Sequence, residues 1–184
     1  MKGRDKLLEP VDGVPQILRV ARMALDVSDD VTVLLRPGTP DRARVLSGLA
    51  LDVIEPTAAL EGMSGSLRAG FHHLKTRPSP VLLLLSDLPE LDTNDLRAVI
   101  DAPGAAPDAL IWRGATEDGK PGHPILFAPS LFNEFARLKG DGGGKEVVQK
   151  AGSRVHLVPL KKSRARLDLD TPGDWTDWRV RTGR

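Results

Sequence analysis

Short apolar runs alternate with segments of helical spacing along the first half of the chain. The runs predict strands over Val31–Leu35, Leu51–Ile54 and Val81–Leu85. Spacing of three and four predicts a helix from Val14 onward, with Pro15 in its first turn, and further helices over Asp41–Gly48, Glu61–Leu74 and Thr93–Asp101. Strands that alternate with helices require right-handed crossovers between parallel strands. The pattern therefore predicts a three-layer α/β fold with a mostly parallel central sheet.

The second half of the chain is less regular. Strands are predicted over Ala109–Trp112, His123–Phe127 and Val155–Val158, and helices over Ser130–Leu138 and Lys145–Lys150. Leu167–Asp170 alternates, which places Asp168 and Asp170 on one face of an extended segment, and Thr171 can cap a last helix that begins with Pro172. No repeat or low-complexity linker divides the sequence. We therefore expect one domain over residues 1–184.

The run Val81–Leu85 leads directly into Ser86-Asp87-Leu88-Pro89. Five consecutive aliphatic residues predict a strand that is buried on both faces, and Asp87 then lies at its carboxyl end. Open α/β sheets bind their ligands at that edge. Asp87 can act there as a turn or cap residue before the next helix, or as a carboxylate that holds a divalent metal ion.

Composition excludes several functional classes. The 184 residues are 40% hydrophobic and 28% charged, with a formal net charge of +1, so there is no general electrostatic case for binding nucleic acid or a membrane surface. No apolar run is long enough to span a bilayer, and the N-terminus does not resemble a signal peptide. The absence of cysteine excludes disulfides, iron–sulfur clusters and thiolate catalysis, and a cytoplasmic setting fits it.

Two aspartates are the strongest candidates for a site. Asp87 and Asp170 each follow an extended segment, and oxygen ligands of this kind suit Mg²⁺, which proteins bind through one or two carboxylates together with substrate phosphates. The implied substrate is a nucleotide or polyphosphate. Its transfer requires positioning and charge neutralisation, for which Lys6, Arg68 and backbone amides are available.

Each motif also has an ordinary structural interpretation. Asp168 and Asp170 can serve only to cap the last helix, and His123 before Pro124 is typical of a hydrogen-bonded loop histidine. The glycine-rich segments Gly62–Ser66 and Gly140–Gly144 are typical of flexible turns, and Lys161–Arg166 of a solvated surface. It is the combination of these motifs that favours a site.

The order of the motifs resembles the molybdenum-cofactor nucleotidyltransferase-like family, within the wider group of sugar-phosphate-type nucleotidyltransferases. The segments that carry the resemblance are Met1–Leu8, Glu61–Gly70, Leu85–Pro89, Gly119–Phe127, Gly140–Lys145 and Leu167–Trp175. The resemblance implies a Rossmann-like nucleotidyltransferase fold that uses Mg²⁺ with CTP or GTP. A phosphate of molybdopterin would attack the α-phosphorus of the nucleotide and release pyrophosphate, and a molybdoenzyme or its chaperone would be a further partner.

The resemblance also assigns roles to individual residues. Asp87 matches the family's metal-binding aspartate, Asp170 the second position on the metal side, and Lys6 the lysine that contacts the nucleotide phosphates. The loop of Gly62, Met63 and Ser64 matches a segment near the nucleobase, and the segment of Gly122, His123 and Pro124 matches one that lines the acceptor side.

The sequence departs from the family pattern at its start. Family members begin with a strand and a glycine-rich loop before the segment that corresponds to Met1–Lys6, and we expect this first strand to be missing here. Either the start was placed too late or the chain is a shortened relative. Smaller departures are Gly65 in place of serine, and Gly144-Lys145 in place of Ala-Arg.

Three hypotheses follow from the sequence. The first is a Mg²⁺-dependent nucleotidyltransferase of the molybdopterin cytidylyl or guanylyl type. The second is a non-catalytic relative that binds a cofactor or partner protein. The third is transfer to a sugar phosphate or another acceptor. An in-frame glycine-rich segment in the DNA upstream of Met1 would favour an enzyme, and a stop codon there would favour the binder. The motifs do not separate CTP from GTP.

Overall fold

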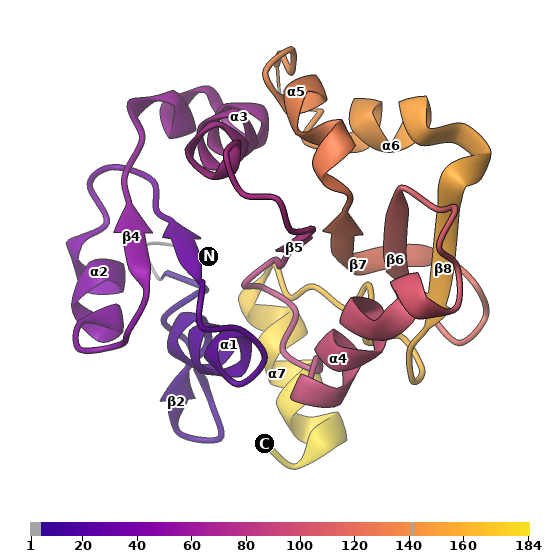
Figure 1. Cartoon of the computed structure of the whole chain (residues 1–184). Coiled ribbons are helices and arrows are strands. Elements are labelled where there is room, and N and C mark those ends of the chain that lie inside the picture. Colours follow the sequence, from indigo (N-terminus) through magenta and orange to yellow (C-terminus); the bar gives the residue numbers. More distant parts are fainter. Residues whose placement is uncertain (1–4, 141) are drawn as a thin grey trace.

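A computed structural model describes residues 5–140 and 142–184, and Figure 1 shows the arrangement of its elements. The strands are β1 (Pro10–Val11), β2 (Val14–Pro15), β3 (Thr32–Leu34), β4 (Asp52–Ile54), β5 (Val81–Leu83), β6 (Ile111–Ala115), β7 (Pro121–Phe127) and β8 (Val155–Pro159). The α-helices are α1 (Gln16–Leu25), α2 (Pro40–Leu46), α3 (Met63–Leu74), α4 (Thr93–Asp101), α5 (Phe132–Phe135), α6 (Lys145–Ala151) and α7 (Pro172–Thr182). A 3₁₀ helix, η1 (Thr57–Glu61), precedes α3.

The largest sheet has the strand order β5-β7-β6-β8. β6 and β8 are parallel, and β7 runs antiparallel to both of its neighbours, β5 and β6. β3 and β4 form a separate parallel pair, and β1 and β2 a short antiparallel one. Three of the four strands in the largest sheet thus share one direction, which confirms the predicted α/β class with a single antiparallel strand, β7.

Helices cover both faces of the sheet (Figure 1). On one face, α3, α5 and α6 pack on β6 and β7 through a cluster that includes Phe71, Phe127 and Phe135. The Phe71 and Phe135 rings are stacked with their centroids 3.5 Å apart, and Phe127 meets Phe135 edge to face. On the other face, α1 and α4 pack on the same strands around Trp112 and Leu126. Alternate residues of β6 and β7 therefore supply the two cores, as strand geometry requires.

The strand Val81–Leu85 is less central than the sequence predicts. Every residue from Val81 to Leu85 is only partly buried, and β5 is an edge strand with β7 as its single partner. The prediction that both faces are fully buried is therefore wrong. The physical reason is that, within residues 5–140 and 142–184, no pairing joins β5 to β3. The expectation that the family's first strand is missing concerns the segment ahead of Met1, outside the described residues, and stays a prediction.

The remaining helices follow local signals. Asp92 caps α4 by accepting hydrogen bonds from the Asn94 and Asp95 backbone N–H groups, and Thr171 caps α7 in the same way through Asp174. The capping role that the sequence allowed for the last helix is therefore carried by Thr171 and Asp174, which leaves the Asp170 carboxylate available. No helix in the described part of the chain is long and apolar enough to cross a membrane.

Candidate active site

Lys6, Asp87 and Asp170 meet at the carboxyl end of β5. The Lys6 ammonium donates to Asp87 Oδ2 at 2.9 Å and to Asp170 Oδ1 at 2.6 Å. Burial lowers the pKa of Lys6, but the hydrogen bonds to Asp170 and Asp87 outweigh this, so its pKa lies above the ordinary value. The three residues that the sequence analysis assigned to metal and phosphate binding thus form one cluster, from three distant parts of the chain.

The turn that carries Lys6 is fixed by its neighbour. Asp5 accepts two hydrogen bonds from the Arg42 guanidinium, at 2.6 and 2.9 Å, and a third from the Leu7 backbone N–H. Burial raises the pKa of Asp5, but the hydrogen bonds from Arg42 and Leu7 lower it by more. The pKa of Asp5 therefore lies below the ordinary value. A bidentate pair of this kind specifies geometry as well as charge. It orients the backbone from which Lys6 extends.

The segment that carries Asp170 is fixed at both ends. Upstream, Arg164 pairs with Asp92 and Asp95 at the start of α4, and the His123 N–H donates to the Ala165 carbonyl at 2.8 Å. Downstream, the Asp170 N–H donates to Asp174 Oδ2 at 3.1 Å. The basic stretch that the sequence presented as a solvated surface therefore includes one partly buried arginine that holds this segment in place.

The carboxylate pair fits a hard divalent cation. Two oxygens, one from each aspartate, already converge on a single positive atom, and Asp87 Oδ1 is buried without a hydrogen-bond partner among the described residues. In the part of the chain that the structure describes, no cluster of three or more acidic or histidine side chains forms a metal cage. Magnesium commonly binds with few protein ligands and completes its shell with water and phosphate oxygens.

A cavity of about 610 Å³ opens beside this cluster. Its lining residues come from α3, β5 and the segment after it, β6, β7, the glycine-rich segment before α6, and α6 itself: Met63, Leu67, Leu83, Leu85, Arg113, His123, Ile125, Phe127, Gly142, Gly143, Gly144, Lys145, Val148 and Gln149. Leu85 is two residues before Asp87, so the cavity reaches the carboxyl end of β5. A pocket of this size holds a small-molecule ligand.

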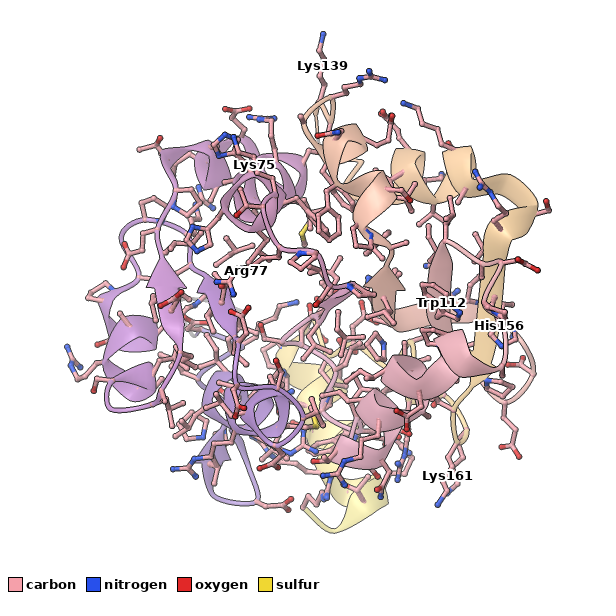
Figure 2. All side chains as sticks on the ribbon, viewed as in Figure 1. Lys75, Arg77, Trp112, Lys139, His156 and Lys161 are labelled. Atoms are coloured by element: carbon pink, nitrogen blue, oxygen red, sulfur yellow. The ribbon has the colours of Figure 1, made fainter. Side chains whose placement is uncertain are left out.

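Two loops that the sequence singled out meet at this cavity. Gly62 has φ 100°, a conformation that favours glycine, and it directs the chain into α3, whose first residue, Met63, lines the cavity. The Ser64 hydroxyl is buried, and it accepts a hydrogen bond from the Gly143 N–H at 3.1 Å. Ser64 therefore ties the glycine-rich segment to α3. The Lys139 side chain, at the start of that segment, points out into solvent (Figure 2).

The segment of Gly122, His123 and Pro124 lies at the start of β7. His123 lines the cavity, and its pKa is lowered to about 4 by burial and by the positive charge of Arg113, although Asp87 acts in the opposite direction. His123 is therefore neutral at neutral pH. Gly122 is required by packing, because a Cβ there would lie 2.1 Å from the Ala165 carbonyl oxygen. Pro124 is buried in the strand.

Arg68 makes its contacts outside this cluster. Its guanidinium donates to Glu61 Oε2 at 2.6 Å and to the Leu138 carbonyl at 3.1 Å. The side chain thus links α3 to η1 and to the end of the α5 segment. Because both terminal nitrogens are engaged there, we do not assign Arg68 a role at the phosphates.

Arg113 was not predicted as a site residue from the sequence. The predicted strand ended at Trp112, whereas β6 continues to Ala115 and Arg113 faces the cavity from the middle of that strand. A charged residue between Trp112 and Gly114 in an apolar strand was the available signal, because a buried charge normally requires a partner. A second hollow, of about 680 Å³, is lined by residues of the β6–β7 turn and of segment 162–166. It contains none of the predicted site residues.

An α/β sheet with two carboxylates beside the end of one strand, and a cavity next to them, fits a nucleotidyltransferase. Residues 1–155 match the family model described as the MobA-like NTP transferase domain, so the chain belongs to that family. Asp170 lies beyond the matched residues, and its place in the site rests on its contact with Lys6. A comparison with curated proteins by sequence gave no match.

Solved structures agree with this assignment. Rv0371c from Mycobacterium tuberculosis H37Rv is similar at 27% identity and a TM-score of 0.77, over 96% of this chain and 90% of that one. Its complex with manganese gives 27% identity and a TM-score of 0.73, over 94% and 89%. A 4-diphosphocytidyl-2C-methyl-D-erythritol synthase shares the fold, at 17% identity and a TM-score of 0.76 over 95% and 93%. The chain is a nucleotidyltransferase.

Proposed function

We propose that the protein transfers CMP or GMP from CTP or GTP to the phosphate of a molybdopterin-type acceptor and releases pyrophosphate. The observation that carries the proposal is the Lys6 ammonium held between Asp87 and Asp170, beside a cavity that reaches Leu85, two residues before Asp87. The MobA-like family supports nucleotidyl transfer as the chemistry. In this proposal the triphosphate binds at the Lys6 cluster and the acceptor binds in the cavity.

The reaction requires one bond to form and one to break. An oxygen of the acceptor phosphate attacks the α-phosphorus of the nucleotide, and the bond from that phosphorus to the bridging oxygen breaks to release pyrophosphate. The protein lowers the barrier by alignment and by neutralising charge on the phosphate oxygens. Lys6 supplies a positive charge for the departing pyrophosphate. His123 is neutral, so it can orient the acceptor by a hydrogen bond without adding charge.

Asp87 and Asp170 are the residues that would hold Mg²⁺. When bound, the ion would supply positive charge that neutralises the phosphate oxygens. The manganese complex of the Mycobacterium tuberculosis protein supports a divalent cation in this group of proteins. Lys6 bonds one oxygen of each of these carboxylates. Its ammonium carries three donors on a flexible stem, so it can also bond phosphate oxygens.

The nucleotide and further partners follow from the same proposal. A CMP:2-keto-3-deoxy-manno-octonic acid synthetase structure, solved with CTP, shares the fold at 13% identity and a TM-score of 0.74, over 97% of this chain and 91% of that one. This supports CTP as the first nucleotide to test, with GTP as the alternative. A molybdopterin product would pass to a molybdoenzyme or its chaperone, in the cytoplasm.

Transfer to an acceptor other than molybdopterin is the second candidate. The synthetase and the synthase named above act on acceptors of other kinds, and they resemble this chain in fold about as closely as the mycobacterial protein does. Fold alone therefore supports either class of acceptor. Which acceptor the protein uses depends on which one its cavity binds, and the following assay compares them directly.

Pyrophosphate release tests the proposal. The full chain is incubated with Mg²⁺, CTP or GTP, and either molybdopterin or 2-keto-3-deoxy-manno-octonic acid. We expect release that depends on molybdopterin and on one nucleotide. Release with the sugar acid in place of molybdopterin would establish the second candidate. No release with either acceptor and either nucleotide would contradict nucleotidyl transfer by this chain.

A further inference from the structure

The guanidinium of Arg113 faces the cavity from the middle of β6. Its Nε donates to the Gly122 carbonyl at 2.8 Å, which fixes the plane of the group. Within residues 5–140 and 142–184, no carboxylate lies within 4 Å of its nitrogens. Arg19 and Arg164 are also partly buried, but Arg164 pairs with two aspartates and Arg19 does not line this cavity. Arg113 is thus a cation in the site without a described counter-ion.

The surroundings of Arg113 do not neutralise its charge. Burial and the neighbouring Arg166 both lower the pKa of Arg113, but an arginine stays protonated in proteins. His123, the other titratable group on the inner wall, is neutral at neutral pH. Lys145, which also lines the cavity, is a further cation. A partly desolvated charge without a partner is costly unless a ligand supplies the opposite charge.

Much of the rest of the wall is apolar. Met63 and Leu67 of α3 and Val148 of α6 contribute to it, whereas Lys145 and Gln149 of α6 are polar. Leu83, Leu85, Ile125 and Phe127 line the cavity from the side of the sheet. These residues lie on the same face of their strands as Arg113, because alternate residues of β5, β6 and β7 point the same way. A ligand that fills the cavity therefore has an apolar or flat body with a negatively charged group at one end.

We propose that Arg113 binds the oxyanion of the acceptor, a phosphate or a carboxylate, while the apolar wall holds the acceptor's body. The guanidinium presents a planar pair of donors that matches such a group, which lysine cannot reproduce. This inference rests on the proposed transfer for the identity of the ligand as acceptor. Arg113 would be a binding residue that sets acceptor specificity and places the attacking group next to Asp87.

Calorimetric titration with simple probes tests the anion site without nucleotide or metal. Phenyl phosphate carries both an apolar body and an oxyanion, benzoate replaces the phosphate by a carboxylate, and inorganic phosphate lacks the body. We expect phenyl phosphate to bind more tightly than inorganic phosphate, and the comparison with benzoate identifies the preferred anion. Arg113→Gln should weaken phenyl phosphate binding by about tenfold or more, because a charge-assisted hydrogen bond is lost.

Arg166→Gln is the matched control. It removes the same charge close to Arg113, but Arg166 does not line this cavity and donates instead to the Pro121 carbonyl. We expect this variant to retain the affinity of the wild type within about threefold, because Arg166 is exposed and its charge is screened by solvent. Arg113→Lys, which keeps the charge, should fall between the two. Circular dichroism and thermal unfolding verify that each variant is folded.

Three results would overturn the inference. They are equal losses in Arg113→Gln and Arg166→Gln, undiminished binding in Arg113→Gln, and no binding of phenyl phosphate or benzoate by the wild type at millimolar concentration. Kinetics separate this inference from the proposed function. An anion site that depends on Arg113 in a protein that releases no pyrophosphate would leave the site standing and contradict the transfer. Pyrophosphate release with an unchanged acceptor KM in Arg113→Gln would support the transfer and contradict the role of Arg113 in binding the acceptor.

Discussion

The Lys6 ammonium lies 2.6 Å from Asp170 Oδ1, although the two residues are 164 positions apart in the chain. The same ammonium lies 2.9 Å from Asp87. The ammonium thus brings two carboxylates together around one positive charge, and a divalent metal ion bound there would do the same. The contact therefore defines the centre of the proposed site, and it makes the roles of the two aspartates separately testable.

Replacing Asp170 should weaken metal binding. Asp170→Asn removes one of the two convergent carboxylates, so we expect the affinity for Mn²⁺, followed by electron paramagnetic resonance, to fall by about tenfold or more. Asp168→Asn is the control, because that side chain is exposed and lies two residues away. Equal affinities in the two variants would mean that Asp170 is not a ligand.

Replacing Lys6 should separate metal binding from transfer. In Lys6→Met the ammonium no longer competes for the carboxylate oxygens, so Mn²⁺ should bind at least as tightly as in the wild type. Pyrophosphate release should nevertheless fall by about a hundredfold, because the positive charge of Lys6 no longer stabilises the negative phosphate oxygens. Weaker Mn²⁺ binding in this variant would show that Lys6 organises the aspartates without competing with the ion.

His123 should titrate far below the usual range for histidine. Its pKa in the folded protein is lowered to about 4, from 6.5, by burial and by Arg113. Because the unfolded chain binds this proton more readily, His123 favours unfolding as the pH falls from 6.5 toward 4, and has no such effect above 6.5. The free energy of unfolding should therefore decline less between pH 7 and pH 4.5 in His123→Gln than in the wild type.

Nuclear magnetic resonance gives the direct measurement of that pKa. Arg113→Gln removes one of the two causes of the shift, so the pKa of His123 should rise in that variant. Arg137→Gln is a control, since Arg137 is exposed on the far end of the α5 segment and is not among the groups that shift His123. A His123 pKa near 6.5 in the wild type would mean that its imidazole is exposed to solvent, and it would contradict the partly buried position of His123 beside Arg113.

Gly65 should not tolerate the serine that is usual in the family pattern. A Cβ at Gly65 would lie 1.8 Å from the Ala58 carbonyl oxygen, so η1 and α3 would have to separate. We expect Gly65→Ser to cost about 1–3 kcal/mol in urea unfolding. Gly104→Ser is the matched control, because nothing lies within 4 Å of a Cβ at that position. Equal stability of the two variants would contradict the close packing of η1 on α3.

Local signals in the sequence predicted most of the elements. The prediction for α4 matches at both ends, because Asp92 supplies a cap and the apolar spacing is regular. The limits of β6 were missed, because Arg113 and Gly114 look like the end of a strand when only the chain pattern is considered. Burial of β5 was overestimated, since an apolar run does not reveal which of its edges are paired.

The identities of several site residues could be predicted from the sequence, whereas most of their contacts could not. Asp87, Asp170 and Lys6 could be chosen because each lies in a motif, and the structure brings them together. Arg68 could not be placed, because its partners, Glu61 and the Leu138 carbonyl, depend on how α3 packs. Ser64 likewise bonds to a loop 79 residues away, a contact that no local pattern encodes.

The most direct test of the central claim is pyrophosphate release by Asp87→Ala, measured beside Asp168→Ala in the full chain with Mg²⁺, nucleotide and molybdopterin. If the Asp87–Asp170–Lys6 cluster performs the transfer, Asp87→Ala should lose activity by about a hundredfold or more. Asp168→Ala should remain close to the wild type. Undiminished release by Asp87→Ala, in a variant that is shown to be folded, would contradict the assignment of this cluster as the active site.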